Sequence, residues 1–168
     1  EQSAVRAARE AGVPVIGELE LASRWLRGRV VAVTGTKGKS TTSVLVGRLL
    51  DASGFSTLVG GNLGPALSAQ VDASTPEVIH VVEASSFQLE LTERFHPWIA
   101  VLLNLSPDHL DRHETVERYA TAKARILANQ EATDWVVVNA DDPQVLAMAR
   151  ASQARRLSFA LEAPISDG

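Results

Sequence analysis

The stretch RVVAVTGTKGKSTTSVLVGRLL (Arg29–Leu50) indicates the fold of the chain. Val30 to Val33 form a short apolar run, which is typical of a strand buried in a parallel sheet. A glycine-containing turn follows at residues 35–40, and an amphipathic pattern then runs from Thr41 to about Ala52. Strand, glycine loop and helix in this order are the context of a phosphate-binding loop.

The residues of this loop suit an anion and its counter-ion. Gly35 and Gly38 let backbone N–H groups turn towards a phosphate, and the positive end of the following helix points to the same place. Lys39 supplies a charge for the terminal phosphates, and the hydroxyl of Ser40 or Thr41 can ligate Mg²⁺. The first position of the usual pattern is a valine here, so the loop is a variant. The alternative is a glycine-rich turn that only connects the strand to the helix.

The composition of the chain narrows its function class. With 168 residues it has the length of one domain, and its 45% hydrophobic content is that of a globular protein. The net charge of −4 gives no electrostatic argument for binding nucleic acid or an anionic membrane surface. The chain has no cysteine, which excludes disulfides and thiolate chemistry and suits the cytosol. No apolar run reaches the roughly 18 residues of a membrane span.

Strand and helix patterns alternate along the chain, which predicts an α/β fold with a parallel sheet and helices on both faces. Besides the strand at 30–33, the apolar runs predict strands at 13–16, 57–59, 78–82, 99–103, 135–138 and 156–159. Helical patterns lie at 3–11, 18–26, 65–71, 115–129 and 143–150, with a turn or short helix at 84–90 and a loop at 106–113. The part before about Gly28 is interpreted as the tail of a preceding domain or a linker.

Several predicted strands run directly into polar residues, namely Thr34, Glu83, Asn104 and Asn139. The carboxyl ends of parallel strands share one edge of a sheet, and ligands bind in the crevice there. Any single strand meets a polar residue when it reaches the surface, which is the alternative explanation. We expect these groups to lie together at the edge that carries the glycine loop.

Two places at this edge carry candidate metal ligands, namely Glu83 and the segment Asp108–His113. Glu83, beside the loop, is the expected second ligand of a nucleotide-bound Mg²⁺, or else a solvated glutamate at a strand end. In Asp108–His113, His109 is a candidate for binding a cation or an anionic substrate, although polar loops often collect such residues. Asp111 and Arg112 have the alternative role of closing the loop through a salt bridge.

Lys123 is the least ordinary residue of the predicted helix at 115–129. It lies on the apolar stripe, four residues after Tyr119 and four before Leu127, so it is expected to point into the domain. A lysine in that position needs a partner, a route to solvent or a modification. Asn139 is a candidate for reading an adenine edge, or part of a turn capped by Asp142. His80 and His113 are interpreted as bystanders, His80 as a core residue in the middle of a strand, and His96 precedes Pro97 in a turn.

These pieces together resemble the central ATP-binding domain of the Mur ligases. The matching segments, in family order, are TGTKGKST (34–41), GGNLG (60–64), EASSFQLE (83–90), 104–112, 119–123 and 138–142, within about residues 29–159. The SSFQLE stretch favours the members that add D-glutamate. Lys37 stands where those members usually have Asn. Folylpolyglutamate synthases, in the same superfamily, often carry Lys there.

The resemblance implies a P-loop-containing three-layer α/β/α fold with a mainly parallel sheet. It implies a monomeric, cytoplasmic, ATP-dependent ligase of peptidoglycan synthesis that joins D-glutamate to UDP-N-acetylmuramoyl-L-alanine through an acyl phosphate. The ATP site would comprise Gly35, Thr36, Lys37, Gly38, Lys39, Ser40, Thr41 and Asn139, and the substrate site Asn62, Ser85, Gln88 and His109. Two Mg²⁺ sites are implied, one at Ser40 and Glu83, the other at His109 and a carbamylated Lys123. Lys39, Glu83, His109 and Lys123 would be the catalytic residues.

The resemblance also implies how the chain is divided. Residues 1–28 would be the end of a UDP-binding domain and its linker, 29–161 the ATP-binding domain, and 162–168 a frayed segment. The domain that brings the amino acid would lie outside the chain, so that the chain alone is expected not to complete ligation. The alternatives are a folylpolyglutamate-type ligase and a nucleotide-binding module or switch without ligase activity.

Overall fold

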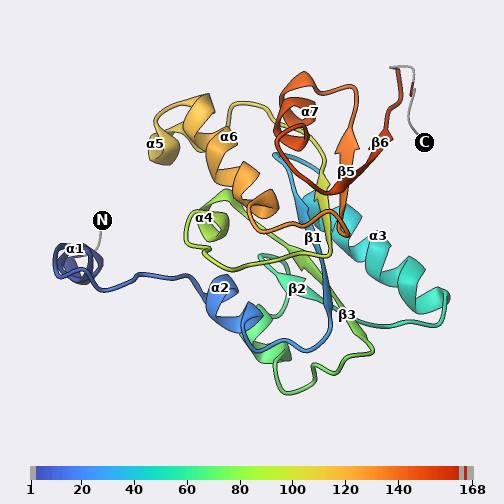
Figure 1. The fold of residues 1–168 in the computed structure, drawn as a ribbon, viewed down its shortest axis with the longest axis horizontal. Helices are drawn as coiled ribbons and strands as arrows, with labels where there is room; N and C mark the ends of the chain where they lie inside the picture. The colour runs from blue at the N-terminus through green and yellow to red at the C-terminus, as the bar shows by residue number, and fades with distance from the viewer. Residues whose placement is uncertain (1–2, 163–164, 166–168) are drawn as a thin grey trace.

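The computed structural model describes residues 3–162 and 165, apart from the side chain of Leu110. Its six described strands form one sheet in the order β2-β3-β1-β4-β5-β6, and every neighbouring pair is parallel (Figure 1). The strands are β1 (Arg29–Thr34), β2 (Ser56–Gly61), β3 (Val78–Glu83), β4 (Ile99–Leu102), β5 (Trp135–Asn139) and β6 (Arg155–Phe159). The predicted α/β fold with a parallel sheet is confirmed.

The helices lie on both faces of this sheet, which gives three layers. They are α1 (Ser3–Glu10), α2 (Glu18–Ser23), α3 (Lys39–Ala52), α4 (Ser86–Leu89), α5 (Leu110–His113), α6 (Val116–Ala124) and α7 (Pro143–Ala149), with 3₁₀ turns η1 (Leu67–Gln70) and η2 (Arg125–Leu127). α3 packs on one face, where Val46 and Leu50 meet Val31, Val33 and the apolar residues of β3. α2, α4, α6 and α7 cover the opposite face, α5 packs on α6, and α1 stands apart at the end of an extended segment (Figure 1).

The larger part of the core lies between the sheet and the helices opposite α3. Alternate residues of the strands face it, because successive strand side chains point to opposite sides. Ala32, Val82 and Ala100 therefore pack with Tyr119 and Ile126. α2 belongs to the same core, since Leu19 and Ala22 are buried in it. The assignment of residues 1–28 to a preceding domain and linker stays a prediction.

Some predicted elements differ from the structure. The strand predicted at 13–16 is absent, and those residues run extended without a neighbouring strand to pair with. The helix predicted at 65–71 is reduced to η1, because Pro65 belongs to a turn in which its carbonyl accepts a hydrogen bond from Gly61 N. The helix predicted at 115–129 ends as α6 at Ala124 and continues as η2. The loop predicted at 106–113 contains α5.

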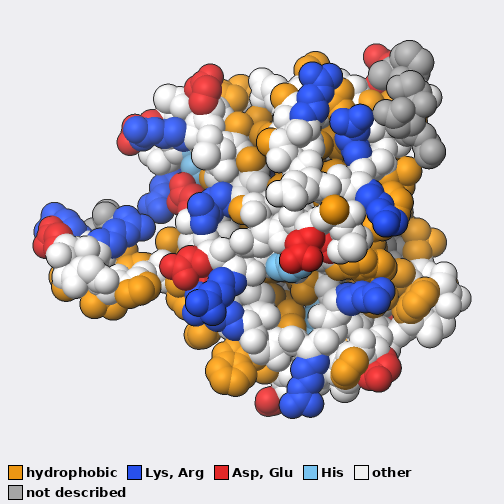
Figure 2. All heavy atoms as spheres, in the orientation of Figure 1, with side chains coloured by type: hydrophobic (Ala, Val, Ile, Leu, Met, Phe, Trp, Pro, Cys, Tyr) orange, Lys and Arg blue, Asp and Glu red, His pale blue; other side chains and the backbone are white. Residues whose placement is uncertain are grey.

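The surface carries charges of both signs. Figure 2 shows Lys and Arg side chains interspersed with Asp and Glu on one face of the molecule. Among the helices that the structure describes, none combines the length and the apolar character required to traverse a bilayer.

Candidate functional site

The carboxyl ends of the central strands lie at one edge of the sheet, as predicted. β1 is paired with β3 on one side and β4 on the other, so Thr34 ends between Glu83 and Leu102. The Thr34 hydroxyl donates to Ala84 O at 2.9 Å, which joins the ends of β1 and β3. Asn139, at the end of β5, donates from Nδ2 to Leu103 O at 3.0 Å. The edge is thus a connected polar surface formed by four strands.

The glycine loop is held in shape by Asn104, which follows β4. Asn104 Oδ1 accepts from Thr36 N at 3.1 Å and Lys37 N at 2.8 Å, and its Nδ2 donates to Lys37 O at 3.0 Å. Thr36 Oγ1 accepts from Ser106 N at 3.0 Å. The sequence indicated Asn104 only as a polar strand end and gave it no role. Its function as a support of the loop depends on the strand order, which places β4 beside β1.

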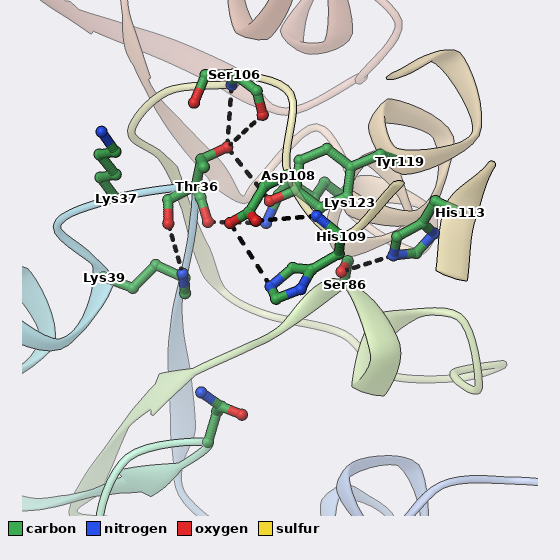
Figure 3. A network of polar contacts seen from close by, with 12 residues as sticks. Thr36, Lys37, Lys39, Ser86, Ser106, Asp108, His109, His113, Tyr119 and Lys123 are labelled. Atoms are coloured by element: carbon green, nitrogen blue, oxygen red, sulfur yellow. Dashed lines mark hydrogen bonds and ion pairs between the residues drawn. The ribbon is translucent and has the colours of Figure 1, made fainter. Parts of the chain in front are cut away.

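The beginning of α3 is open to an anion. Gly38 is its N-cap residue, has φ +83° and has no side chain to cap the first amides of the helix. Those amides have no carbonyl partner within the helix, and they carry the positive end of its dipole. Lys39 Nζ lies at the same place and donates to Thr36 O at 2.9 Å (Figure 3). This arrangement fits a polyphosphate. Lys37, by contrast, points away from Lys39 in Figure 3.

Glu83 is buried at the end of β3 and faces the start of α3. Its Oε2 accepts from the Ser40 hydroxyl at 2.7 Å, and its Oε1 accepts from Asn62 Nδ2 at 2.8 Å. A carboxylate and a hydroxyl side by side are oxygen ligands of the kind that Mg²⁺ prefers. The structure therefore brings Ser40, Asn62 and Glu83 together, although within the described residues no three His, Asp or Glu side chains form a ready metal site.

Lys123 points into the domain, as the helical pattern predicted. It is 2% exposed, and its Nζ donates to Gly35 O at 2.8 Å and lies 4.6 Å from the centre of the Tyr119 ring. Burial, and then the charge of Lys39, lower the pKa of the Lys123 amine to about 7, although nearby carboxylates act in the opposite direction. A substantial fraction of this amine is therefore neutral at physiological pH.

His109 lies in the loop before α5 and is half exposed. Its φ of +52° is unusual for a residue with a side chain. The imidazole lies 6.4 Å from the Tyr119 ring and 5.0 Å from the Phe87 ring, and Asp108 Oδ2 is 3.6 Å from its Nε2. Figure 3 shows Asp108, His109 and Lys123 around Tyr119. The salt bridge suggested between Asp111 and Arg112 is replaced by a pair of Arg112 with Glu90 at 3.2 Å.

The remaining candidates are on the same edge, and each has contacts within the protein. Ser85 and Gln88 form a capping box at the start of α4, in which the Ser85 side chain accepts from Gln88 N at 3.3 Å. Asn139 Oδ1 accepts from Asp141 N at 3.0 Å. Because Nδ2 uses one of its two N–H groups for Leu103 O, the other remains for another partner. Asp142 is the predicted N-cap, here of α7.

The three other histidines differ in their surroundings. His80 is a buried core residue as predicted, hydrogen-bonded to Ser74 and Gln70 at 2.8 Å each. His96 Nε2 is 2.6 Å from Asp134 Oδ2, far from the glycine loop at the other end of the strands. His113, interpreted from the sequence as a bystander, is 2% exposed and contacts α4. No periodic pattern in the sequence pointed to it, because α5 is a single turn.

Comparisons with known proteins identify a family and relatives that are similar to this sequence. The family model described as "Mur ligase middle domain" matches residues 33–167. The UDP-N-acetylmuramoylalanine–D-glutamate ligase of Anaeromyxobacter dehalogenans is 53% identical over 162 residues, which are 96% of this chain and 35% of that protein. The ligase of the same name from Pelotomaculum thermopropionicum is 46% identical over 98% of this chain and 36% of its own length. The chain thus spans about a third of these relatives.

A solved structure agrees with the sequence relatives. The MurF ligase of Thermotoga maritima, determined in complex with ADP, superposes with a TM-score of 0.67 at 26% identity. The match covers 87% of this chain and 36% of that one.

Proposed function

The chain belongs to the Mur ligase family, whose middle domain it contains, and we propose that the protein to which it belongs joins D-glutamate to UDP-N-acetylmuramoyl-L-alanine at the expense of ATP. The relatives of that name, 53% and 46% identical, support this choice of substrates. The observation that carries it is Lys123, whose buried amine lies 2.8 Å from Gly35 O in the glycine loop. A regulatory nucleotide switch or a simple binding module gives this amine no task.

ATP is assigned to the glycine loop and the start of α3. The phosphates would be held by the backbone of residues 35–41 and by Lys39, which exchanges its bond to Thr36 O for a phosphate oxygen. Lys37 adds positive charge at the rim of the same site. Asn139 would meet the adenine through the N–H that its bond to Leu103 O leaves available. The ADP complex of the Thermotoga maritima ligase supports nucleotide binding by this fold.

Mg²⁺ is assigned to two places that flank the phosphates. Ser40 and Glu83 supply oxygen ligands for the first. His109 and Lys123 would hold the second once Lys123 is a carbamate. In that reaction the neutral amine attacks CO₂, a new N–C bond forms, and one amine proton leaves to the solvent. The lowered pKa of Lys123 supports this step, because only the neutral amine is a nucleophile.

The acceptor is assigned to Asn62, Ser85, Gln88 and His109, which lie along the same edge of the sheet. Its carboxylate would be phosphorylated by ATP, and the amine of D-glutamate would displace phosphate from the acyl phosphate. The residues of this chain contribute by placing the reactants and by neutralising charge at the phosphates. No side chain of this chain needs to form a covalent intermediate.

The proposal extends to the organisation of the protein. Residues 1–28 are assigned to the end of a UDP-binding domain and its linker, and 29–161 to the ATP-binding domain. The amino acid would be brought by a further domain. We propose that the enzyme is a monomer in the cytoplasm.

The test uses the full-length protein. Phosphate release from ATP is expected only when D-glutamate and UDP-N-acetylmuramoyl-L-alanine are both present. Equal turnover with another amino acid would refute the assignment of D-glutamate. Lys37 favours the folylpolyglutamate-type alternative, and a competition between a folate and the UDP-linked acceptor decides between the two.

A further inference from the structure

We propose that His113 is a positioning residue, which fixes α4 against α5 and so keeps the two sides of the acceptor site in register. The inference rests on the proposed function, because α4 carries Ser85 and Gln88 and the loop before α5 carries His109. None of these three residues contacts His113 through its own polar side-chain atoms in the described structure. The imidazole acts on the site through the helices that bear them.

The contacts of His113 reach across both helices. Its Nε2 lies 2.9 Å from Ser86 Oγ, at the first residue of α4, and its Nδ1 lies 3.1 Å from Glu90 Oε1, just after the end of α4. The imidazole is therefore bracketed by the two ends of one helical turn. Its ring also stacks on Phe87, with centroids 5.4 Å apart and planes inclined by 8°.

The contact between His113 and Ser86 is costly to lose because both residues are buried. His113 and Ser86 are each 2% exposed, so water cannot replace either partner if the contact is lost. Glu90 is tied in addition to Arg112 of α5 at 3.2 Å, which makes a second link between the same helices. The His113–Ser86 contact is the buried part of this network, whereas the side chains of Glu90 and Arg112 are 30% and 53% exposed. A buried polar contact is rigid when both of its members are paired.

The order Ser86, His113, Glu90 also has the geometry of a nucleophile, a base and an orienting carboxylate. Burial of Ser86 excludes that role, because a substrate carbonyl has no access to its hydroxyl. The same contacts serve instead to hold α4, whose capping box at Ser85 and Gln88 begins one residue earlier. Ser86 is thus bonded to His113 of α5, while its neighbour Ser85 belongs to the capping box of α4.

The first experiment compares the kinetics of variants of the full-length enzyme. His113→Phe keeps a ring for stacking on Phe87 but removes both polar contacts. We expect kcat/KM for the UDP-linked acceptor to fall about tenfold while KM for ATP is unchanged. His113→Gln, which retains an amide for Ser86 or Glu90, is expected to recover part of the loss. Ser86→Ala is a smaller change that should act in the same direction if His113→Phe folds poorly.

The matched control is His80→Phe. His80 is also buried and has two polar partners, but it lies in the middle of β3, and both partners, Ser74 and Gln70, lie outside α4 and α5. We expect this variant to keep both KM values per folded molecule. An unchanged kcat/KM in His113→Phe and Ser86→Ala, or an equal change of both KM values, would overturn the proposal.

The second experiment requires no turnover. Hydrogen exchange of the full-length protein is followed by mass spectrometry in the wild type and in His113→Phe. Amides of residues 86–90 and 109–113 are expected to exchange about tenfold faster in the variant, while those of α3 keep their rates. If the wild type fails to ligate D-glutamate, the proposed function is refuted, and the exchange measurement still tests the positioning role of His113. Equal exchange in both proteins would refute the positioning role.

Discussion

Replacing Lys123 with methionine tests whether the burial of its charged amine lowers the free energy of unfolding. Methionine has a similar length and no charge, so Lys123→Met removes the amine and retains most of the packing. The pKa of this amine falls from its ordinary 10.5 to about 7, first because of burial and next because of Lys39. Holding the proton on it in the folded protein therefore costs about 5 kcal/mol.

The pH dependence follows from the direction of this change. Below pH 7 the amine is protonated in both the folded and the unfolded chain, so the wild type bears the whole cost. Above about pH 7 the folded amine loses its proton while the unfolded amine keeps it up to about 10.5. The contribution of Lys123 to the free energy of unfolding thus rises by about 1.4 kcal/mol per pH unit in this range.

Lys123→Met lacks that rise, and its stability relative to the wild type is the quantity to measure. The lost hydrogen bond to Gly35 O costs the variant about 1 to 3 kcal/mol, nearly independent of pH. Urea unfolding of both proteins from pH 6 to 9, without CO₂ or metal and monitored by tryptophan fluorescence, gives the difference. We expect the advantage of the variant to shrink by about 2 to 3 kcal/mol between pH 7 and pH 9. Parallel stability curves would refute the reasoning.

Four further changes address the loop, the two proposed metal ligands Glu83 and Lys123, and the core. Gly38→Ala places a side chain at φ +83°, so we expect a loss of about 1 kcal/mol of stability and weaker ATP binding, measured by urea unfolding and calorimetry. Glu83→Gln keeps the shape of the bonds to Ser40 and Asn62 but removes the charge; Mg²⁺-dependent ATP binding in calorimetry should weaken at least about tenfold, and Mg²⁺-independent binding should not. Glu20 is buried, which would raise its pKa, but backbone N–H groups of Glu93, Arg94 and Phe95 together with Arg24 lower it. Glu20→Gln should therefore reduce the free energy of unfolding by about 2 kcal/mol at pH 7, and the difference should vanish as the pH falls below 4.5, because the carboxylate stabilises only while it is ionised. Lys123→Ala should abolish phosphate release, and short-chain carboxylic acids should restore part of it; full activity of the unrescued variant would favour a nucleotide switch.

The strands could be predicted from the sequence because the buried strands are continuous apolar runs. β1, β3 and β5 each extend only one residue or so beyond the predicted limits. The run at 13–16 has the same local character but no partner strand, and Pro14 in it has no N–H for a ladder, so it stays extended. Local patterns identify strand-forming sequence, whereas pairing depends on the rest of the fold.

The residues of the candidate site also divide into those that a local sequence pattern could predict and those whose role depends on the rest of the fold. Lys123 was predictable because it interrupts an apolar stripe at helical spacing, and the structure buries it as expected. Asn104 and His113 had no such signal. Asn104 supports the glycine loop because β4 neighbours β1, although they are separated by β2 and β3 in sequence. His113 reaches Ser86 only because α5 folds back on α4.

The bonds of Asn104 have a consequence for the thermodynamics of nucleotide binding. Residues 36 and 37 are already fixed by three hydrogen bonds to its amide, and Lys39 is already directed into the loop by Thr36 O. The loss of conformational entropy in this segment therefore accompanies folding and does not recur when ATP arrives. Binding requires chiefly that Lys39 exchange one oxygen for another. A nucleotide thus encounters a preorganised receptor, and its association rate is limited by access to the sheet edge, not by rearrangement of the loop.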